Sequence, residues 1–130
     1  MVIDRYSYSG AVYSAAKGKD DLSLTWAWQP EIGLPRPDIW FFLNLWPEEA
    51  ARRAGYGGER YEETGLQTQV GRIYRSLVGM ENNEEMRMVD AARSEDEIAS
   101  DIREQTLHCI ADLGSIGPLR NLGPLPFPSE

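Results

Sequence analysis

The sequence is poor in the residues that build disulfides and metal sites, with one cysteine and one histidine among 130 residues. A lone cysteine, Cys109, cannot form an internal disulfide, which favours a reducing compartment. No apolar run approaches the roughly 18 residues that a membrane-spanning helix needs. The first ten residues place Asp4 and Arg5 where a secretory signal would be apolar. We therefore expect a cytoplasmic protein without membrane segments.

Signatures of common catalytic chemistry are also missing from the sequence. The glycine-rich stretch GYGGERY, residues 55–61, has neither the Lys-Ser/Thr of a phosphate-binding P-loop nor the spacing of a dinucleotide fingerprint. His108 and Cys109 are neighbours, and neighbours on a helix point about 100° apart, which prevents contact between a nucleophile and its base. These observations leave catalysis open, but they favour a non-enzymatic protein. We predict no cofactor.

His108 is also the centre of the one pattern that suggests a metal ion. It lies one helical turn from Glu104 and one from Asp112, and all three side chain types can bind cations. A single exposed helix face rarely closes a coordination shell, and the sequence has no second histidine. We therefore predict no metal site.

Negative charge is what the sequence has in excess. The net charge is −8, and residues 81–112 alone carry ten acidic and three basic side chains. Such a field repels nucleic-acid backbones and anionic membranes, and it attracts basic partners. Because nucleic-acid affinity comes mainly from Lys and Arg on phosphates, we expect neither direct nucleic-acid binding nor membrane binding.

Hydrophobic periodicity predicts a single domain over residues 1–113, followed by a proline- and glycine-rich tail over residues 114–130. Residues 10–29 fit a β-hairpin around KGKDD, because every second residue from Leu22 to Trp28 is leucine or tryptophan. The next segment, PEIGLPRP, contains three prolines, which cannot sit in a paired strand. We expect a loop there.

Residues 38–46, DIWFFLNLW, form an extended segment that is apolar on both faces from Ile39 onward apart from Asn44. This pattern predicts a strand buried on both sides, and Pro47 then starts a short helix that Gly55 ends. Both faces of such a strand need cover, so we expect helices on each side or a homodimer. A second short strand is predicted at MRMVDA, residues 86–91.

Two longer helices are predicted from capping boxes and helical spacing. Thr64 and Gln67 are spaced to cap a helix over residues 65–78, and Ser94 and Glu97 to cap one over 94–113. The fold class is therefore predicted as α+β. We expect a single domain with an antiparallel sheet of about four strands, packed against a long C-terminal helix and one or two shorter helices.

The acidic side chains of this C-terminal helix form the main candidate site. One interpretation is an ordinary solvated helix face. The functional interpretation is a contact surface for a basic protein partner, because the excess charge is concentrated here. The candidate partner-binding residues are Glu95, Asp96, Glu97, Asp101, Glu104 and His108.

On this basis we predict a small acidic protein-binding module that inhibits a basic target which handles nucleic acid. Such a module resembles the general style of bacterial immunity or anti-defence proteins. The likeness is one of size and charge. The mechanism would be steric blocking of the target with electrostatic steering of association.

Two other functions fit the sequence. Four tryptophans and six tyrosines are many for this length, and the simplest explanation is core packing. In one alternative, Trp40, Asn44 and Trp46 line a pocket of a small-ligand-binding domain or enzyme. In the other, the chain is an oligomerisation or scaffold domain.

Overall fold

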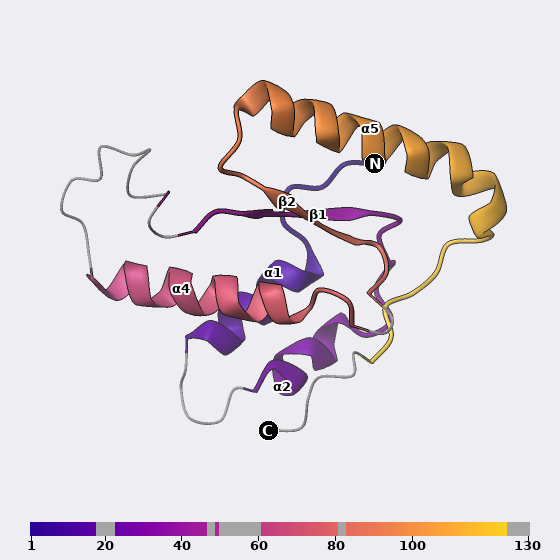
Figure 1. Cartoon of the computed structure of the whole chain (residues 1–130). Coiled ribbons are helices and arrows are strands. Elements are labelled where there is room, and N and C mark those ends of the chain that lie inside the picture. Colours follow the sequence, from indigo (N-terminus) through magenta and orange to yellow (C-terminus); the bar gives the residue numbers. More distant parts are fainter. Residues whose placement is uncertain (18–22, 47–48, 50–60, 81–82, 125–130) are drawn as a thin grey trace. The chain divides into compact units, whose positions relative to one another are not determined.

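The computed structural model describes residues 1–17, 23–46, 49, 61–80 and 83–124. Their elements, in chain order, are α1 (Ser7–Ala16), α2 (Leu24–Trp28), the 3-10 helix η1 (Gln29–Glu31), β1 (Trp40–Asn44), α4 (Tyr61–Ser76), β2 (Met86–Asp90) and α5 (Glu95–Ile116) (Figure 1). The chain divides into two compact units. Unit 1 comprises the described residues of Met1–Arg36, Tyr61–Glu84 and Arg120–Glu130, and unit 2 those of Pro37–Arg60 and Glu85–Leu119.

Unit 1 is helical, and its core lies where α1 packs on α2 and α4. Trp28 is 2% exposed, and its ring packs on that of Tyr8 with 4.9 Å between the centroids. The other buried apolar side chains of these helices recur at helical spacing; they are Ala11, Val12 and Ala16 on α1, Ala27 on α2, and Val70 and Tyr74 on α4.

The β-hairpin predicted over residues 10–29 is wrong, because two helices occupy this part of the chain. The Ser23 hydroxyl accepts a hydrogen bond from the main-chain amide of Trp26 at 3.1 Å and so caps α2. The two tryptophans of α2 differ in burial, since Trp26 is 58% exposed while Trp28 is buried. The alternating pattern that suggested a strand is thus overridden by a helix cap and by core packing. The turn predicted at KGKDD lies outside the described residues apart from Lys17.

A segment close to residue 120 completes unit 1. Main-chain hydrogen bonds of 2.8–2.9 Å join residues 120–122 to residues 33–36, with a bridge between Pro35 and Asn121. Leu122 is buried, and the indole N–H of Trp28 donates to the Gly123 carbonyl at 2.9 Å. The loop predicted after residue 30 is confirmed from Ile32 onward, while the division of the chain at residues 113 and 114 stays a prediction.

Unit 2 contains a parallel pair of strands. β1 and β2 pair in register from Trp40 with Met86 to Asn44 with Asp90. Parallel strands need a long crossover connection, and the connection here includes α4. Both strands lie where the sequence predicts them, but the predicted antiparallel sheet of four strands is wrong: the described residues form two strands, and these run parallel.

The strand β1 is also less buried than its sequence predicts. Leu43 is 50% exposed, although the pattern of residues 39–46 predicts cover on both faces. Among the described residues the sheet has two strands, so β2 is the one strand beside β1. The short helix predicted to follow lies outside the described residues apart from Glu49.

The two longer helices are confirmed, with shifted ends. α5 has the predicted capping box, in which Ser94 and Glu97 bind each other's main-chain amides. This helix runs to Ile116, where the sequence predicts an end before Gly114, and Gly117 then takes a positive φ of 86°. α4 begins at Tyr61, so Thr64 lies inside the helix and is not its cap.

Candidate functional site

The backbone of unit 1 is unusual just before α1. Among the described residues, Arg5 is the one non-glycine residue with a positive φ, at 61°. Residues held in this left-handed region are uncommon and cluster at functional sites. The next residue, Tyr6, is the N-cap of α1 but makes no side-chain capping bond, and the first turn holds no acidic residue. An arginine therefore stands beside a helix N-terminus whose dipole also favours an anion.

Three polar side chains line one side of α1 from this point. Ser9 and Tyr13 lie four residues apart on α1, the spacing that places side chains on one face of a helix. Arg5 precedes the helix and reaches them through its side chain. The Arg5 guanidinium carbon lies 5.4 Å from the centroid of the Tyr13 ring, a cation–π contact. Ser9 and Tyr13 are half-buried and Arg5 is exposed, so solvent can reach this set, which we call the α1 stripe.

A fourth residue joins the α1 stripe from another helix. The Tyr74 hydroxyl of α4 lies 3.0 Å from the Ser9 hydroxyl in a hydrogen bond, and Tyr74 is 8% exposed. Burial raises the pKa of Tyr74, against a smaller opposite effect of the Ser9 hydrogen bond, and the phenol also interacts with Tyr13 and Arg5. The four side chains thus share one neighbourhood, the α1–α4 cluster.

One buried hydroxyl lies close to this cluster in the sequence. Ser7, the first residue of α1, is buried, and its side-chain oxygen has no hydrogen-bond partner within the described part of the chain. Buried hydroxyls normally have a partner. An arginine, an uncapped helix start and an unsatisfied hydroxyl therefore follow one another over residues 5–7.

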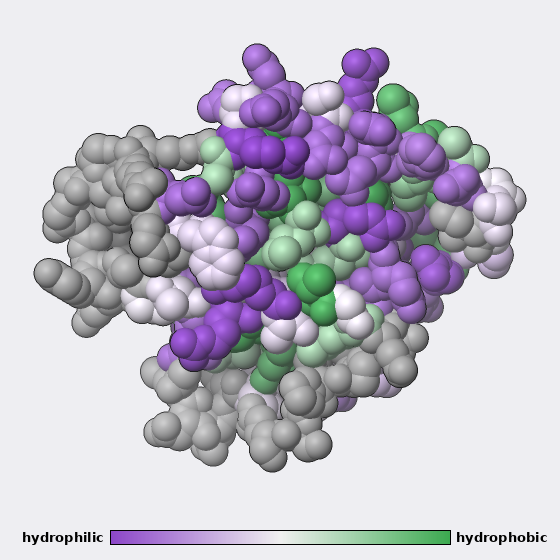
Figure 2. Space-filling view, viewed as in Figure 1, coloured by the Kyte–Doolittle hydropathy of each residue, from purple (hydrophilic) through white to green (hydrophobic). Residues whose placement is uncertain are grey.

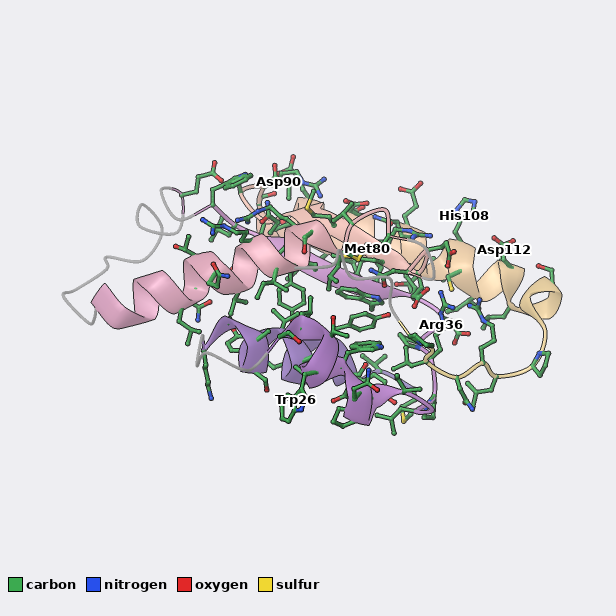
Figure 3. The ribbon with its side chains drawn as sticks, turned by 90° about the horizontal axis from the view of Figure 1, so that it is seen from below. Trp26, Arg36, Met80, Asp90, His108 and Asp112 are labelled. Atoms are coloured by element: carbon green, nitrogen blue, oxygen red, sulfur yellow. The ribbon has the colours of Figure 1, made fainter. Side chains whose placement is uncertain are left out.

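The acidic residues predicted as a partner-binding surface lie on α5. Figure 2 shows hydrophilic side chains over most of the face of α5 in view, and His108 and Asp112 project away from the helix (Figure 3). Five of the six predicted residues are exposed, namely Glu95, Asp96, Glu97, Glu104 and His108, and Asp101 is half-buried.

Two of these carboxylates are bound by groups of unit 2 itself. Asp101 accepts from the Arg93 guanidinium at 2.7 Å and from the Gln105 amide at 2.8 Å. Glu97 accepts from the Ser94 hydroxyl at 2.6 Å and from its main-chain amide at 3.0 Å. These hydrogen bonds lower the pKa of both carboxyl groups, and they give both a structural role at the start of α5.

The Asp101 contact leads to a prediction about acid sensitivity. Because the folded-state pKa of Asp101 is lowered, chiefly by Arg93, its contribution to stability is present above its unfolded pKa of about 3.9. It is lost as the pH falls through the folded-state value. Asp101→Asn should lower the midpoint of thermal unfolding slightly at pH 7, and the difference from wild type should shrink below pH 4.

The control is Asp112→Asn, the same change at an exposed position of the same helix. It should leave the unfolding midpoint unchanged or slightly higher, since a carboxylate near a helix C-terminus opposes the dipole. A loss from Asp101→Asn that stays constant between pH 3 and pH 7 would contradict the assignment.

The predicted pocket residues lie on and after β1. Trp40 and Asn44 are members of the strand, and Trp46 follows it. Asn44 is buried while Trp46 is 49% exposed, and the Asn44 carbonyl accepts from the main-chain amide of Ala91 at 2.9 Å. A pocket at these residues stays a prediction.

Two further properties concern the described residues as a whole. No helix among them is long and apolar enough to cross a membrane. Nor does any group of three or more His, Cys, Asp or Glu side chains within the described ranges have a geometry that could hold a metal ion.

The α1–α4 cluster was not predicted from the sequence. One signal was present, because Tyr8, Ala11, Val12 and Ala16 already have the spacing of a helix. A helix over these residues places Ser9 and Tyr13 together on another side. The proximity of Tyr74, 65 residues from Ser9, has no counterpart in the sequence pattern.

Comparisons with known proteins agree on one family. A family model for thymidylate kinase matches residues 1–102. The thymidylate kinase of Dictyostelium discoideum is 43% identical over 102 residues, which are 78% of this chain and 43% of that protein. The human thymidylate kinase is 39% identical over 103 residues, or 79% of this chain and 47% of that protein.

A solved structure gives the same result. The structure of thymidylate kinase from Candida albicans matches with a TM-score of 0.64 and 30% sequence identity, over 92% of this chain and 57% of that one. The parallel strands and their helical crossover are thus part of the P-loop NTPase fold, an α/β class. The chain belongs to the thymidylate kinase family. It spans about half the length of the curated relatives that it matches.

Family membership corrects several predictions from the sequence. An acidic inhibitor in the style of immunity proteins is wrong, because the family is one of nucleotide kinases. The basic protein partner is wrong for the same reason, since such enzymes act on nucleotides. The α+β class is also wrong. The acidic segment led to the wrong prediction of a basic partner, because net charge determines long-range attraction and does not identify a binding site.

Proposed function

We propose that this chain supplies the nucleotide-monophosphate site of a thymidylate kinase, and that the α1–α4 cluster holds the nucleotide. The observation that carries the proposal is Arg5, held at positive φ beside the uncapped N-terminus of α1. A nucleotide phosphate needs a cationic partner and hydrogen-bond donors, and the exposed guanidinium of Arg5 offers both. The family assignment supports thymidylate as the nucleotide.

The rest of the cluster suits the nucleoside part of such a ligand. Ser9 and Tyr13 lie one helical turn apart on α1, about 6 Å along the axis, and the Arg5 guanidinium lies over the Tyr13 ring. A nucleotide whose phosphate binds Arg5 would therefore place its sugar and base along the α1 stripe. Ser9, Tyr13 and Tyr74 supply hydroxyl groups that can donate and accept, and Tyr13 supplies an aromatic face.

In the reaction of a nucleotide kinase, the bound monophosphate is the acceptor of a phosphoryl group. Catalysis of such transfers depends on positioning and on neutralising phosphate charge. Arg5 would orient the acceptor phosphate and offset its negative charge. Magnesium ions usually accompany this chemistry.

The test is the binding of thymidine monophosphate to the chain, measured by isothermal titration calorimetry beside thymidine and deoxyadenosine monophosphate. We expect thymidine monophosphate to bind at least about tenfold more tightly than thymidine, because charged hydrogen bonds to the phosphate are lost with the nucleoside. If the chain bound thymidine as tightly as thymidine monophosphate, Arg5 would not bind the phosphate. Equal affinity for the adenine nucleotide would remove the thymidylate assignment.

A cytoplasmic location, predicted from the sequence, is retained as part of this proposal. The single cysteine supports it.

A further inference from the structure

The hydrogen bond between Ser9 and Tyr74 links the α1 stripe to α4. It joins side chains 65 residues apart in the sequence, at 3.0 Å between the two oxygens. Tyr74 is buried, and so are Val70 and Leu77, which lie four residues before and three after it, on the same face. The Tyr74 hydroxyl is therefore a fixed point in the wall of the cluster.

Ser9 needs such a fixed point if its hydroxyl is to bind a ligand in one orientation. A serine hydroxyl has one hydrogen and two lone pairs, and it rotates to suit its surroundings. Its side chain also has three staggered rotamers. A bond to a buried phenol selects one rotamer and uses one hydrogen-bonding position, which leaves the other positions of the half-buried Ser9 oxygen for a second partner.

We propose that Tyr74 is a positioning residue for nucleotide binding, which acts by holding the Ser9 hydroxyl toward the nucleoside part of the ligand. The inference rests on the proposed function, and it adds a residue that reaches the site through another side chain. Arg5, whose guanidinium lies over the Tyr13 ring, binds the phosphate, so Ser9 on the same side of α1 is placed to meet the sugar or the base. Tyr74 determines the orientation in which the Ser9 hydroxyl contacts the sugar or the base.

The surroundings of Tyr74 keep its hydroxyl suited to this role. Burial raises the pKa of the phenol above its ordinary value, so the hydroxyl stays protonated at neutral pH and can still donate. Its other charged or titratable neighbours are Tyr13 and Arg5, which belong to the same cluster. The hydroxyl is therefore part of the polar side of the site and not an isolated core group.

The test is a double-mutant cycle on the affinity for thymidine monophosphate, with the variants Ser9→Ala, Tyr74→Phe and both together. Tyr74→Phe should weaken binding by about three- to tenfold, the effect of one lost hydrogen bond. Ser9→Ala should weaken binding at least as much. Because Tyr74 acts through Ser9, the double variant should bind no more weakly than Ser9→Ala alone.

A matched control is Tyr6→Phe, which removes a tyrosine hydroxyl that donates to the Pro35 carbonyl at 3.1 Å. It should leave the affinity unchanged. Thermal unfolding of each variant shows whether the protein is folded at the assay temperature. A purely structural role of Tyr74 would lower the unfolding midpoint without the non-additive effect on affinity.

The outcomes separate this inference from the function on which it rests. If the wild-type chain does not bind thymidine monophosphate, the proposed function fails and the inference fails with it. If the wild type binds but Tyr74→Phe binds equally well, the inference alone is wrong. Additive losses in the double variant would also overturn it, because Tyr74 would then act independently of Ser9.

Discussion

Trp28→Ala is expected to lower the free energy of unfolding by about 3–5 kcal/mol, the usual cost of removing a large aromatic side chain from a core. Trp28 is 2% exposed, and its ring packs against Tyr8. Its indole N–H also donates to the Gly123 carbonyl, so the substitution removes both a packing contact and a hydrogen bond. A loss of this size is a large part of the stability of a small domain.

Trp26→Ala is the matched control, because it removes the same side chain from the same short helix. Trp26 is 58% exposed and points outward from α2 (Figure 3). Its replacement should change stability by no more than about 0.5 kcal/mol. Urea unfolding followed by far-UV circular dichroism measures both variants without relying on tryptophan fluorescence. Equal losses would mean that the two side chains share one face, as on a strand.

Arg5→Gln is expected to weaken the binding of thymidine monophosphate by about 30- to 100-fold, equivalent to about 2–3 kcal/mol for a hydrogen bond to a charged group. Arg5→Lys should recover only part of this loss, because a lysine cannot form the two parallel bonds of a guanidinium fork. Calorimetric titration at constant ionic strength gives the affinities.

The control for charge is Arg103→Gln, the same substitution at an exposed position of α5, which should leave the affinity unchanged. Arg5→Gly separates binding from stability. Glycine adopts positive φ without steric cost, so this variant should lose binding while its unfolding midpoint stays close to that of wild type. A clear loss of stability in Arg5→Gly would give Arg5 a structural role instead.

The elements of unit 2 could be predicted from the sequence because their signals are local. Ser94 and Glu97 form the capping box that their spacing predicts, and the apolar run before Pro47 is a strand. The antiparallel prediction overlooked a signal in the same run, because strands that are apolar on both faces are typical of parallel sheets, whereas antiparallel strands commonly alternate apolar and polar residues. In the structure, Trp40 pairs with Met86 across a connection that contains α4.

Unit 1 was harder to predict because two patterns compete in it. The residues from Leu22 to Trp28 alternate like a strand, while Ser23 is well placed to cap a helix, and the cap prevails. The candidate site depends on α1, which replaces the first strand of the predicted hairpin, since Ser9 and Tyr13 share a face only on a helix. The distribution of charge did not indicate the site. The excess of acidic residues lies on α5, whereas Arg5 lies in a part of the chain where acidic and basic residues nearly balance.

The attachment of residues 120–123 to the loop after η1 has a consequence for synthesis. The contact between Trp28 and Gly123 spans 95 positions, and Leu122 enters the core of unit 1. Neither contact can form until the ribosome has released nearly the whole described chain. In the nascent chain the indole N–H of Trp28 is therefore hydrogen-bonded to water, and unit 1 completes its fold only after residues 120–123 have left the ribosome.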